Sequence, residues 1–379
     1  MSFDLSKQLT RLLFMFIVAL SIVFQWYGHR YGLLLTSDSL QYLSAAHSFK
    51  TEGIFLSPDG SLYTYWPPLF PVILSLADSP ELVLPWINVC VTPGIAFLLF
   101  FLADRIFEKN IFRIIFIMIS LCNVQMIMIS VFLWSELIFF LFVLMAVVCA
   151  VKMKHSNLWF VILLIVLCLM CLQRNAGAFL VPAFSLWFLL DRDRSQRERI
   201  FKSILMLVVG LGGLVIWNVY LSFFTPSGFY FYKHEFFGEL AFNLSRFAST
   251  LCGFIIPLSE GPAGVFGCIL ILIMIFFLFK TERSGLQQLI VLLVLFYFSG
   301  FIVLGKLDAY EMDRYLSVIV AFIYMIFLSL NEKMTMKIRP IQQRALVIIL
   351  MLWLIYPLAR TLKNVSAWNE RSLSSDSRK

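Results

Sequence analysis

The chain has 379 residues, of which 61% are hydrophobic and only 14% are charged. Average soluble domains are about half apolar and about a quarter charged, so this composition excludes an ordinary soluble protein and predicts an integral membrane protein. The net charge of +8 comes from basic residues scattered over many short connections, unlike the clustered patch of a nucleic-acid-binding surface. We therefore expect a lipid bilayer as a partner, and no nucleic acid.

The apolar runs predict an all-α, polytopic fold with about eleven transmembrane helices, in a range of roughly 10 to 12. A span needs roughly 17–25 residues to cross the hydrocarbon core. The candidate runs lie near 10–28, 83–103, 112–132, 136–151, 157–173, 176–190, 201–222, 262–280, 286–304, 315–330 and 344–358. We interpret residues 1–379 as a single transmembrane domain.

Lysine and arginine orient these spans, because cytoplasmic connections carry an excess of them. With the N-terminus in the cytoplasm, the inner connections hold most of the 30 basic residues, and the outer ones hold more acids than bases. The two longest connections, 29–82 and 223–261, are then both outer loops. We expect interfacial helices in the first of them.

The first outer loop contains the stretch "TSDSLQYLSAAHSF". Thr36 or Ser37 can cap a helix, and Asp38 then lies in its first turn, where the helix dipole favours an ionised carboxylate. Asp38, Tyr42 and Phe49 fall on one face of this amphipathic helix, which predicts a position in the membrane interface. Asp38 is either a simple helix N-terminal charge or a functional acid at the membrane surface.

The next stretch, "DGSLYTYWPPLFPVILSL", starts with a turn signal at Asp59–Gly60 and continues through aromatic residues into paired prolines. The prolines predict an extended entry followed by a helix start. The aromatic residues form either an interfacial belt or a platform for a sugar ring. They are Tyr63, Tyr65 and Trp66.

Ionisable residues gather at the outer ends of the predicted spans. They are Glu136 in "VFLWSELIFF", Arg174 in "CLQRNAGAFL", and Lys306 and Arg314 in "GKLDAYEMDRYLSV". Such residues are costly at membrane depth, so they usually mark a site or a salt bridge. Two acids and three cations around one outward-facing cavity suit a substrate with a phosphate or pyrophosphate group.

These motifs, taken in order, resemble the GT-C class of membrane glycosyltransferases, and the pattern is most similar to bacterial protein O-mannosyltransferase-like and aminoarabinose transferase-like enzymes. The matching segments are "SDSLQYLSAA", "YWPPLFPVILSL", "WSELIFFLF", "RNAGAFLVPAF" and "DRYLSVIVAF". The resemblance implies a GT-C-like fold over most of the chain. It also implies a place in the bacterial inner membrane, with the active site on the outer face.

The resemblance further implies transfer of a sugar from a polyprenyl-phosphate-linked donor, with inversion, to a hydroxyl of a lipid, glycan or protein acceptor. Asp38 would be the general base, or would orient the acceptor, because a carboxylate must lie within reach of the attacking hydroxyl. Cations must neutralise the departing phosphate, and the candidates in falling order are Arg314, Lys306 and Arg174.

Glu136 would either hold a divalent cation together with Asp38 or orient one of the cationic side chains. Many members of the class carry two adjacent acids where Asp38 stands between serines, so the metal, Mg²⁺ or Mn²⁺, stays open. The residues expected to contact substrate are Tyr42, Tyr65, Trp66 and Tyr315.

Two alternatives act on the same class of lipid-linked glycan. A flippase or transporter would place charges near the bilayer midplane, on paired interrupted helices. An O-antigen polymerase or ligase would use arginines in a large late loop. The charges here lie at the outer ends of spans, and the longest outer loop is the first one and contains an acid. These features favour the transferase.

Overall fold

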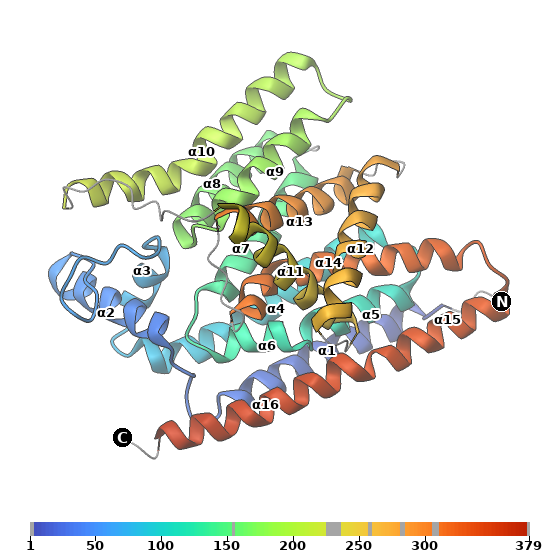
Figure 1. Cartoon of the computed structure of the whole chain (residues 1–379), viewed down its shortest axis with the longest axis horizontal. Helices are drawn as coiled ribbons and strands as arrows, with labels where there is room; N and C mark the ends of the chain where they lie inside the picture. The colour runs from blue at the N-terminus through green and yellow to red at the C-terminus, as the bar shows by residue number, and fades with distance from the viewer. Residues whose placement is uncertain are drawn as a thin grey trace.

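The computed structural model describes residues 4–153, 156–224, 236–256, 260–280, 285–304 and 311–376, and this part of the chain is predominantly α-helical (Figure 1). Its helices are α1 (Lys7–Gly28), α2 (Ser37–Glu52), α3 (Leu69–Ser75), α4 (Pro80–Ile106), α5 (Asn110–Leu121), α6 (Val124–Val131), α7 (Glu136–Lys152), α8 (Asn157–Gln173), α9 (Gly177–Leu189), α10 (Gln196–Ser222), α11 (Phe236–Ile255), α12 (Glu260–Lys280), α13 (Gly285–Leu304), α14 (Met312–Thr335), α15 (Pro340–Trp353) and α16 (Ile355–Asp376).

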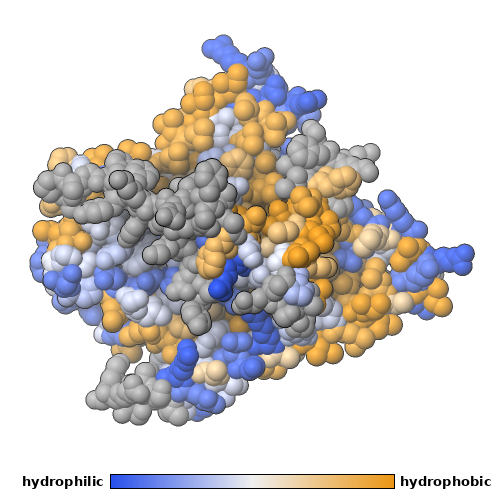
Figure 2. Space-filling model, in the orientation of Figure 1, coloured by the Kyte–Doolittle hydropathy of each residue, from blue (hydrophilic) through white to orange (hydrophobic). Residues whose placement is uncertain are grey.

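Within the described residues, six helices are long and apolar enough to cross a bilayer, and the bent pair α5–α6 would make a seventh. The six are α1, α4, α10, α13, α14 and the helix Pro340–Ser372 formed by α15 and α16. Figure 2 shows a largely hydrophobic surface over α10, with hydrophilic atoms at the tip where α10 begins. The chain is thus an all-α, multi-span integral membrane protein. The count of about eleven spans stays a prediction.

The run 112–132, expected as one span, is broken in the middle. The helix α5 ends at Leu121, and the Asn123 side chain caps α6 by accepting a hydrogen bond from the backbone N–H of Met126 at 2.7 Å. The two helices are bent by 41° relative to each other. The bend changes the direction of the chain, so that α6 packs against α1 and α7.

Two helices lie where the sequence predicted none. The segment 223–261, expected as a long outer loop, contains α11. The last helix continues past the expected end at 358 to Asp376, and within α15 and α16 the stretch Pro340–Ser372 makes one candidate span of 33 residues. Such a helix rises about 50 Å, whereas the hydrocarbon core is about 30 Å thick, so the polar half of α16 extends beyond it.

The helix α14 forms the centre of the bundle, and it packs against α5, α6, α7 and α13. Most of its apolar side chains are buried in the largest hydrophobic core cluster. Because it is enclosed on several sides, a charged residue on a buried face of α14 must find its partners inside the protein.

Three chain segments meet at one end of α14. The Asn110 side-chain amide donates to the Leu5 carbonyl at 2.8 Å, and Glu332 accepts from the Lys109 backbone N–H at 2.7 Å. This end therefore gathers the start of α1, the α4–α5 connection and the last turn of α14. The first residues of α14 lie at the opposite end, next to the chain that follows α1.

Candidate functional site

The site begins with a short pairing between two connections distant in sequence. Leu34, which follows α1, forms an isolated parallel bridge with Phe132, which follows α6. The Leu34 N–H donates to the Val131 carbonyl, and the Leu34 carbonyl accepts from the Leu133 N–H, each at 3.1 Å. This pairing brings the start of α2 beside the start of α7.

The start of α2 is fixed by a capping box, and Thr36 is the cap among the two candidates that the sequence offered. The N-cap is Thr36, whose side chain and backbone exchange hydrogen bonds with Ser39. Ser39 also donates its hydroxyl to the Leu133 carbonyl at 3.0 Å. One face of α2 carries the fully buried Tyr42, whereas Leu40 on the other face is 52% exposed. The predicted helix is present with one buried face, and its first turn holds Asp38.

The start of α7 is held from both sides. The Trp134 indole N–H donates to the Thr36 hydroxyl at 2.9 Å, and the Tyr42 hydroxyl lies 3.2 Å from the Ser135 hydroxyl. Glu136 is the first residue of α7 and is buried. Its backbone position is therefore fixed by α2 before any charge interaction is considered.

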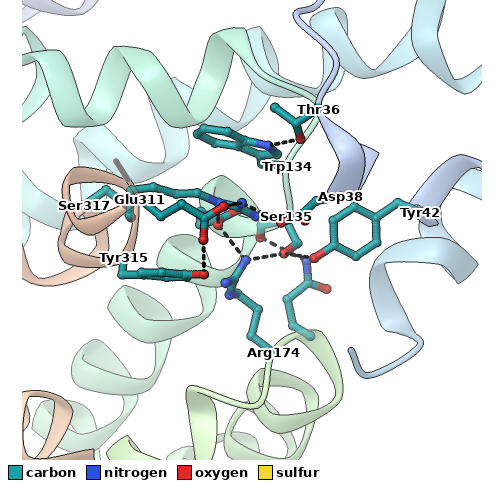
Figure 3. A network of polar contacts seen from close by, with 12 residues as sticks. Thr36, Asp38, Tyr42, Trp134, Ser135, Arg174, Glu311, Tyr315 and Ser317 are labelled. Atoms are coloured by element: carbon teal, nitrogen blue, oxygen red, sulfur yellow. Dashed lines mark hydrogen bonds and ion pairs between the residues drawn. The ribbon is translucent and has the colours of Figure 1, made fainter. Parts of the chain in front are cut away.

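The central feature is Arg314, which lies between two carboxylates (Figure 3). Its Nη1 is 2.5 Å from Asp38 Oδ2, and its Nε donates to Glu136 Oε1. Its guanidinium carbon lies 4.2 Å from the Trp134 ring centroid, which is a cation–π contact. Glu311 approaches the same Nη1 at 3.6 Å. Residues from α2, α7 and α14 thus meet at one guanidinium group.

A second guanidinium shares the same carboxylate oxygen. Arg174 Nη1 lies 2.7 Å from Glu136 Oε1 and donates to the Ser135 hydroxyl at 2.8 Å. The neighbouring Gln173 donates its amide to the Ser135 carbonyl at 3.2 Å. Figure 3 shows Arg174 and Tyr42 both directed at Ser135. The turn between α8 and α9 is thereby attached to the start of α7.

Burial decides which members of this cluster a ligand can reach. The side chains of Glu136 and Arg314 are 1% and 3% exposed, whereas that of Asp38 is 16% exposed. Three buried atoms in the cluster have no hydrogen-bond partner within the described residues: Arg314 Nη2, Glu136 Oε2 and Gln173 Oε1. Native proteins rarely leave such atoms unpaired, so this cluster retains bonding capacity for another molecule.

The cluster fits a guanidinium better than a metal ion between its two acids. Asp38 Oδ2 and Glu136 Oε1 both point at Arg314, which takes the place that a divalent cation would need. Among the described residues, no group of three or more His, Cys, Asp and Glu side chains is arranged to hold a metal.

The predicted substrate-contact residues divide by exposure. Tyr42 is fully buried, and its burial raises the pKa of its phenol to about 12. Tyr65 is 56% exposed, and its ring lies 5.4 Å from the half-buried Trp66 ring, which in turn lies 5.1 Å from Tyr42. Tyr315 donates its hydroxyl to Glu311 beside Arg314. Only the Tyr65–Trp66 pair offers an open aromatic surface among these.

Four of the site residues proposed from sequence are brought together, and Lys306 lies outside the described residues. The four are Asp38, Glu136, Arg174 and Arg314. Sequence reasoning missed Trp134, Ser135, Gln173 and Glu311 as members of the cluster. Each of the four lies within three residues of a charged residue that the sequence analysis had selected. Closeness in sequence to those charged residues could have identified them.

No protein-family model matches this sequence, and a comparison with curated proteins gives no match either. Among solved structures, the chain is similar to ArnT from Cupriavidus metallidurans, whose crystal structure contains bound undecaprenyl phosphate. The TM-score is 0.59 at 15% sequence identity, and the match covers 94% of this chain and 77% of that one. At this identity the likeness shows a shared fold.

Proposed function

We propose that this protein is a glycosyltransferase of the GT-C class that moves a sugar from a polyprenyl-phosphate-linked donor to an acceptor hydroxyl at the outer membrane face. The single observation that supports it best is the accessible carboxylate of Asp38, held against the buried pair of Arg314 and Glu136. The ArnT-like fold adds support, since that relative binds a polyprenyl phosphate.

In this proposal Asp38 acts on the acceptor. A general base must lie within hydrogen-bond distance of the hydroxyl proton that it removes. Asp38, in the first turn of α2, is the most exposed of the three residues Asp38, Arg314 and Glu136. Arg314 binds Asp38 Oδ2, and within the described residues the other carboxylate oxygen has no hydrogen bond and can serve the acceptor.

The cations act on the donor phosphate. Transition-state charge on the leaving phosphate is stabilised by donors that are already in place. Arg314 Nη2 is the one guanidinium nitrogen of that residue without a partner in the described part of the chain, and it is our first candidate for this contact. Arg174, bound to Glu136, and Lys306 complete the set. Glu136 orients the two arginines, and this role leaves no need to assign it a metal.

The topology belongs to the same proposal. We place the N-terminus in the cytoplasm and Asp38 on the outer side of a bacterial inner membrane, with about eleven spans. The contact set of Leu5, Lys109 and Glu332 at the other end of α14 supports this, because those connections are rich in Lys and Arg. Single cysteines placed near Lys7 and near Asp59 should react with impermeant reagents from opposite sides.

The decisive experiment replaces Asp38 by Asn and measures sugar transfer from lipid-linked donor in membranes. We expect normal expression and a fall in transfer of about 10²-fold or more, because the base is lost while the shape is kept. Asp78→Asn is the matched control, since the Asp78 side chain is 98% exposed. A fully active Asp38→Asn variant would remove Asp38 from the chemistry.

The same assay separates the alternatives. A flippase would move labelled donor between leaflets without forming a glycosidic bond. A polymerase or ligase would transfer an oligosaccharide and would tolerate loss of the Asp38 carboxylate. A single-sugar product that depends on Asp38 favours the proposed transferase over both.

A further inference from the structure

We propose that α16 is a positioning element for the site, and that Arg360 and Trp368 hold Arg314 in place from behind. This inference rests on the proposed function. In Figure 1, α16 runs along one edge of the molecule, and its C-terminal end lies on the same side as α2. It packs against α1 and α6.

The first route from α16 to Arg314 is aromatic. Trp368 is 7% exposed, and its ring meets the Phe132 ring edge-on at 6.0 Å. Phe132 stacks on Trp134 at a centroid distance of 4.3 Å with an interplanar angle of 15°. Trp134 in turn lies under the Arg314 guanidinium. The stack therefore supports one face of the Arg314 guanidinium.

The second route is ionic and acts on the α14 backbone. Arg360 Nη2 lies 3.0 Å from Asp313 Oδ2, and Gln125 donates to the other Asp313 oxygen at 3.4 Å. Asp313 directly precedes Arg314 in the first turn of α14. Another Arg360 nitrogen, Nη1, donates to the Gly253 carbonyl at 3.1 Å, near the end of α11. This bond also links α16 to α11.

The two routes start from one face of one helix. Arg360 and Trp368 are about two helical turns apart, so they project from the same side. Between them, Val365 is 1% exposed and packs in the cluster that contains Val131 and Leu34. A shift of α16 would therefore move both the ring under Arg314 and the turn that carries it. Misplacement of reacting groups by about 1 Å can cost about 10²-fold in rate.

The test compares substitutions of buried residues of α16 with the same substitutions, or the nearest equivalent, at exposed positions of α4 and α16. Trp368→Leu is paired with Trp86→Leu, a Trp that is 69% exposed, and Arg360→Gln is paired with Lys363→Gln on the exposed face of α16. We expect the Trp368 and Arg360 variants to lose about tenfold or more in kcat, with KM for the donor near wild type, and the controls to keep both. Trp368→Phe should restore most of kcat, because it retains an aromatic edge against Phe132.

A double-mutant cycle with Arg314→Lys shows whether Trp368 acts through Arg314. We expect Trp368→Leu to cause little further loss of kcat in the Arg314→Lys background. Additive losses, or equal losses in the Trp86 control, would overturn the proposal. If the wild type transfers no sugar, the proposed function fails. The same double-mutant cycle is then measured by thermal unfolding. Coupled shifts in the unfolding temperature support this inference, and additive shifts refute it.

Discussion

The two ends of α14 each bury a charge, but they treat it differently. At one end, Glu332 is 2% exposed, and its two oxygens accept the backbone N–H groups of Lys109 at 2.7 Å and Glu108 at 3.2 Å. At the other end, Arg314 meets side-chain carboxylates, and one of its nitrogens has no partner in the described part of the chain.

This difference distinguishes a charge whose partners all lie within the fold from one that we propose to be functional. Both carboxylate oxygens of Glu332 accept hydrogen bonds from the backbone just before α5, so its bonding capacity is used inside the fold. The cluster of Arg314 and Glu136 leaves donor and acceptor atoms unused in a buried position. Because unused buried polar atoms destabilise a protein, they persist where another molecule completes them.

The largest effect is expected for Glu136→Gln. The substitution keeps the shape but removes the carboxylate that pairs with Arg174 and leaves Arg314 with Asp38 and the more distant Glu311. The loss should lower stability by about 3–5 kcal/mol and abolish most sugar transfer. Thermal unfolding of the purified protein and the transfer assay measure the two effects. Glu52→Gln, an exposed change in α2, is the control, and equal stability of the two variants would contradict the buried-cluster description.

A smaller effect is expected for the same change at the other end. Glu332→Gln loses the charge but keeps one acceptor, so stability should fall by about 1–3 kcal/mol while the kcat of folded enzyme stays at the wild-type level. The exposed Glu108→Gln is its control, since Glu108 contributes only a backbone N–H. A loss of kcat as large as that of Glu136→Gln would erase the contrast between the two ends.

The smallest effect is expected for Tyr42→Phe. It removes one hydroxyl that lies 3.2 Å from the Ser135 hydroxyl, which is worth about 0.5–1.5 kcal/mol. Since burial raises the pKa of Tyr42 to about 12, the phenol stays protonated at neutral pH and the pH profile of transfer should not change. Tyr65→Phe at the exposed position is the comparison. A shifted profile would mean that Tyr42 takes part in proton transfer.

The sequence predicted the local parts of the site because their signals are local. A cap at Thr36 or Ser37 and Asp38 in the first turn follow from residue type and helical spacing, and the structure has Thr36 as the cap. The full burial of Tyr42 was not predicted, since it was expected to contact substrate. The pairing of Arg314 with Glu136 joins residues 178 positions apart. The alternation of the spans between the two membrane sides predicts that both residues lie on the outer side. It does not predict the distance between their side chains.

The helix ends and breaks were harder to predict. Asn123 lies in a continuous apolar run, so hydropathy alone does not reveal the break that its side chain caps. The second half of α16 is polar, and it forms a helix because Thr361, Val365 and Trp368 bury one face against α1 and α6. Tertiary packing, which a window of sequence does not contain, decides both cases.

One oxygen atom, Glu136 Oε1, serves as acceptor for two arginines from distant parts of the chain. Replacing Glu136, Arg174 or Arg314 alone by a neutral residue would leave a buried charge without its partner. We therefore expect these three positions to vary together or not at all among homologous sequences. A joint change at all three would indicate an altered substrate more reliably than a change at one of them.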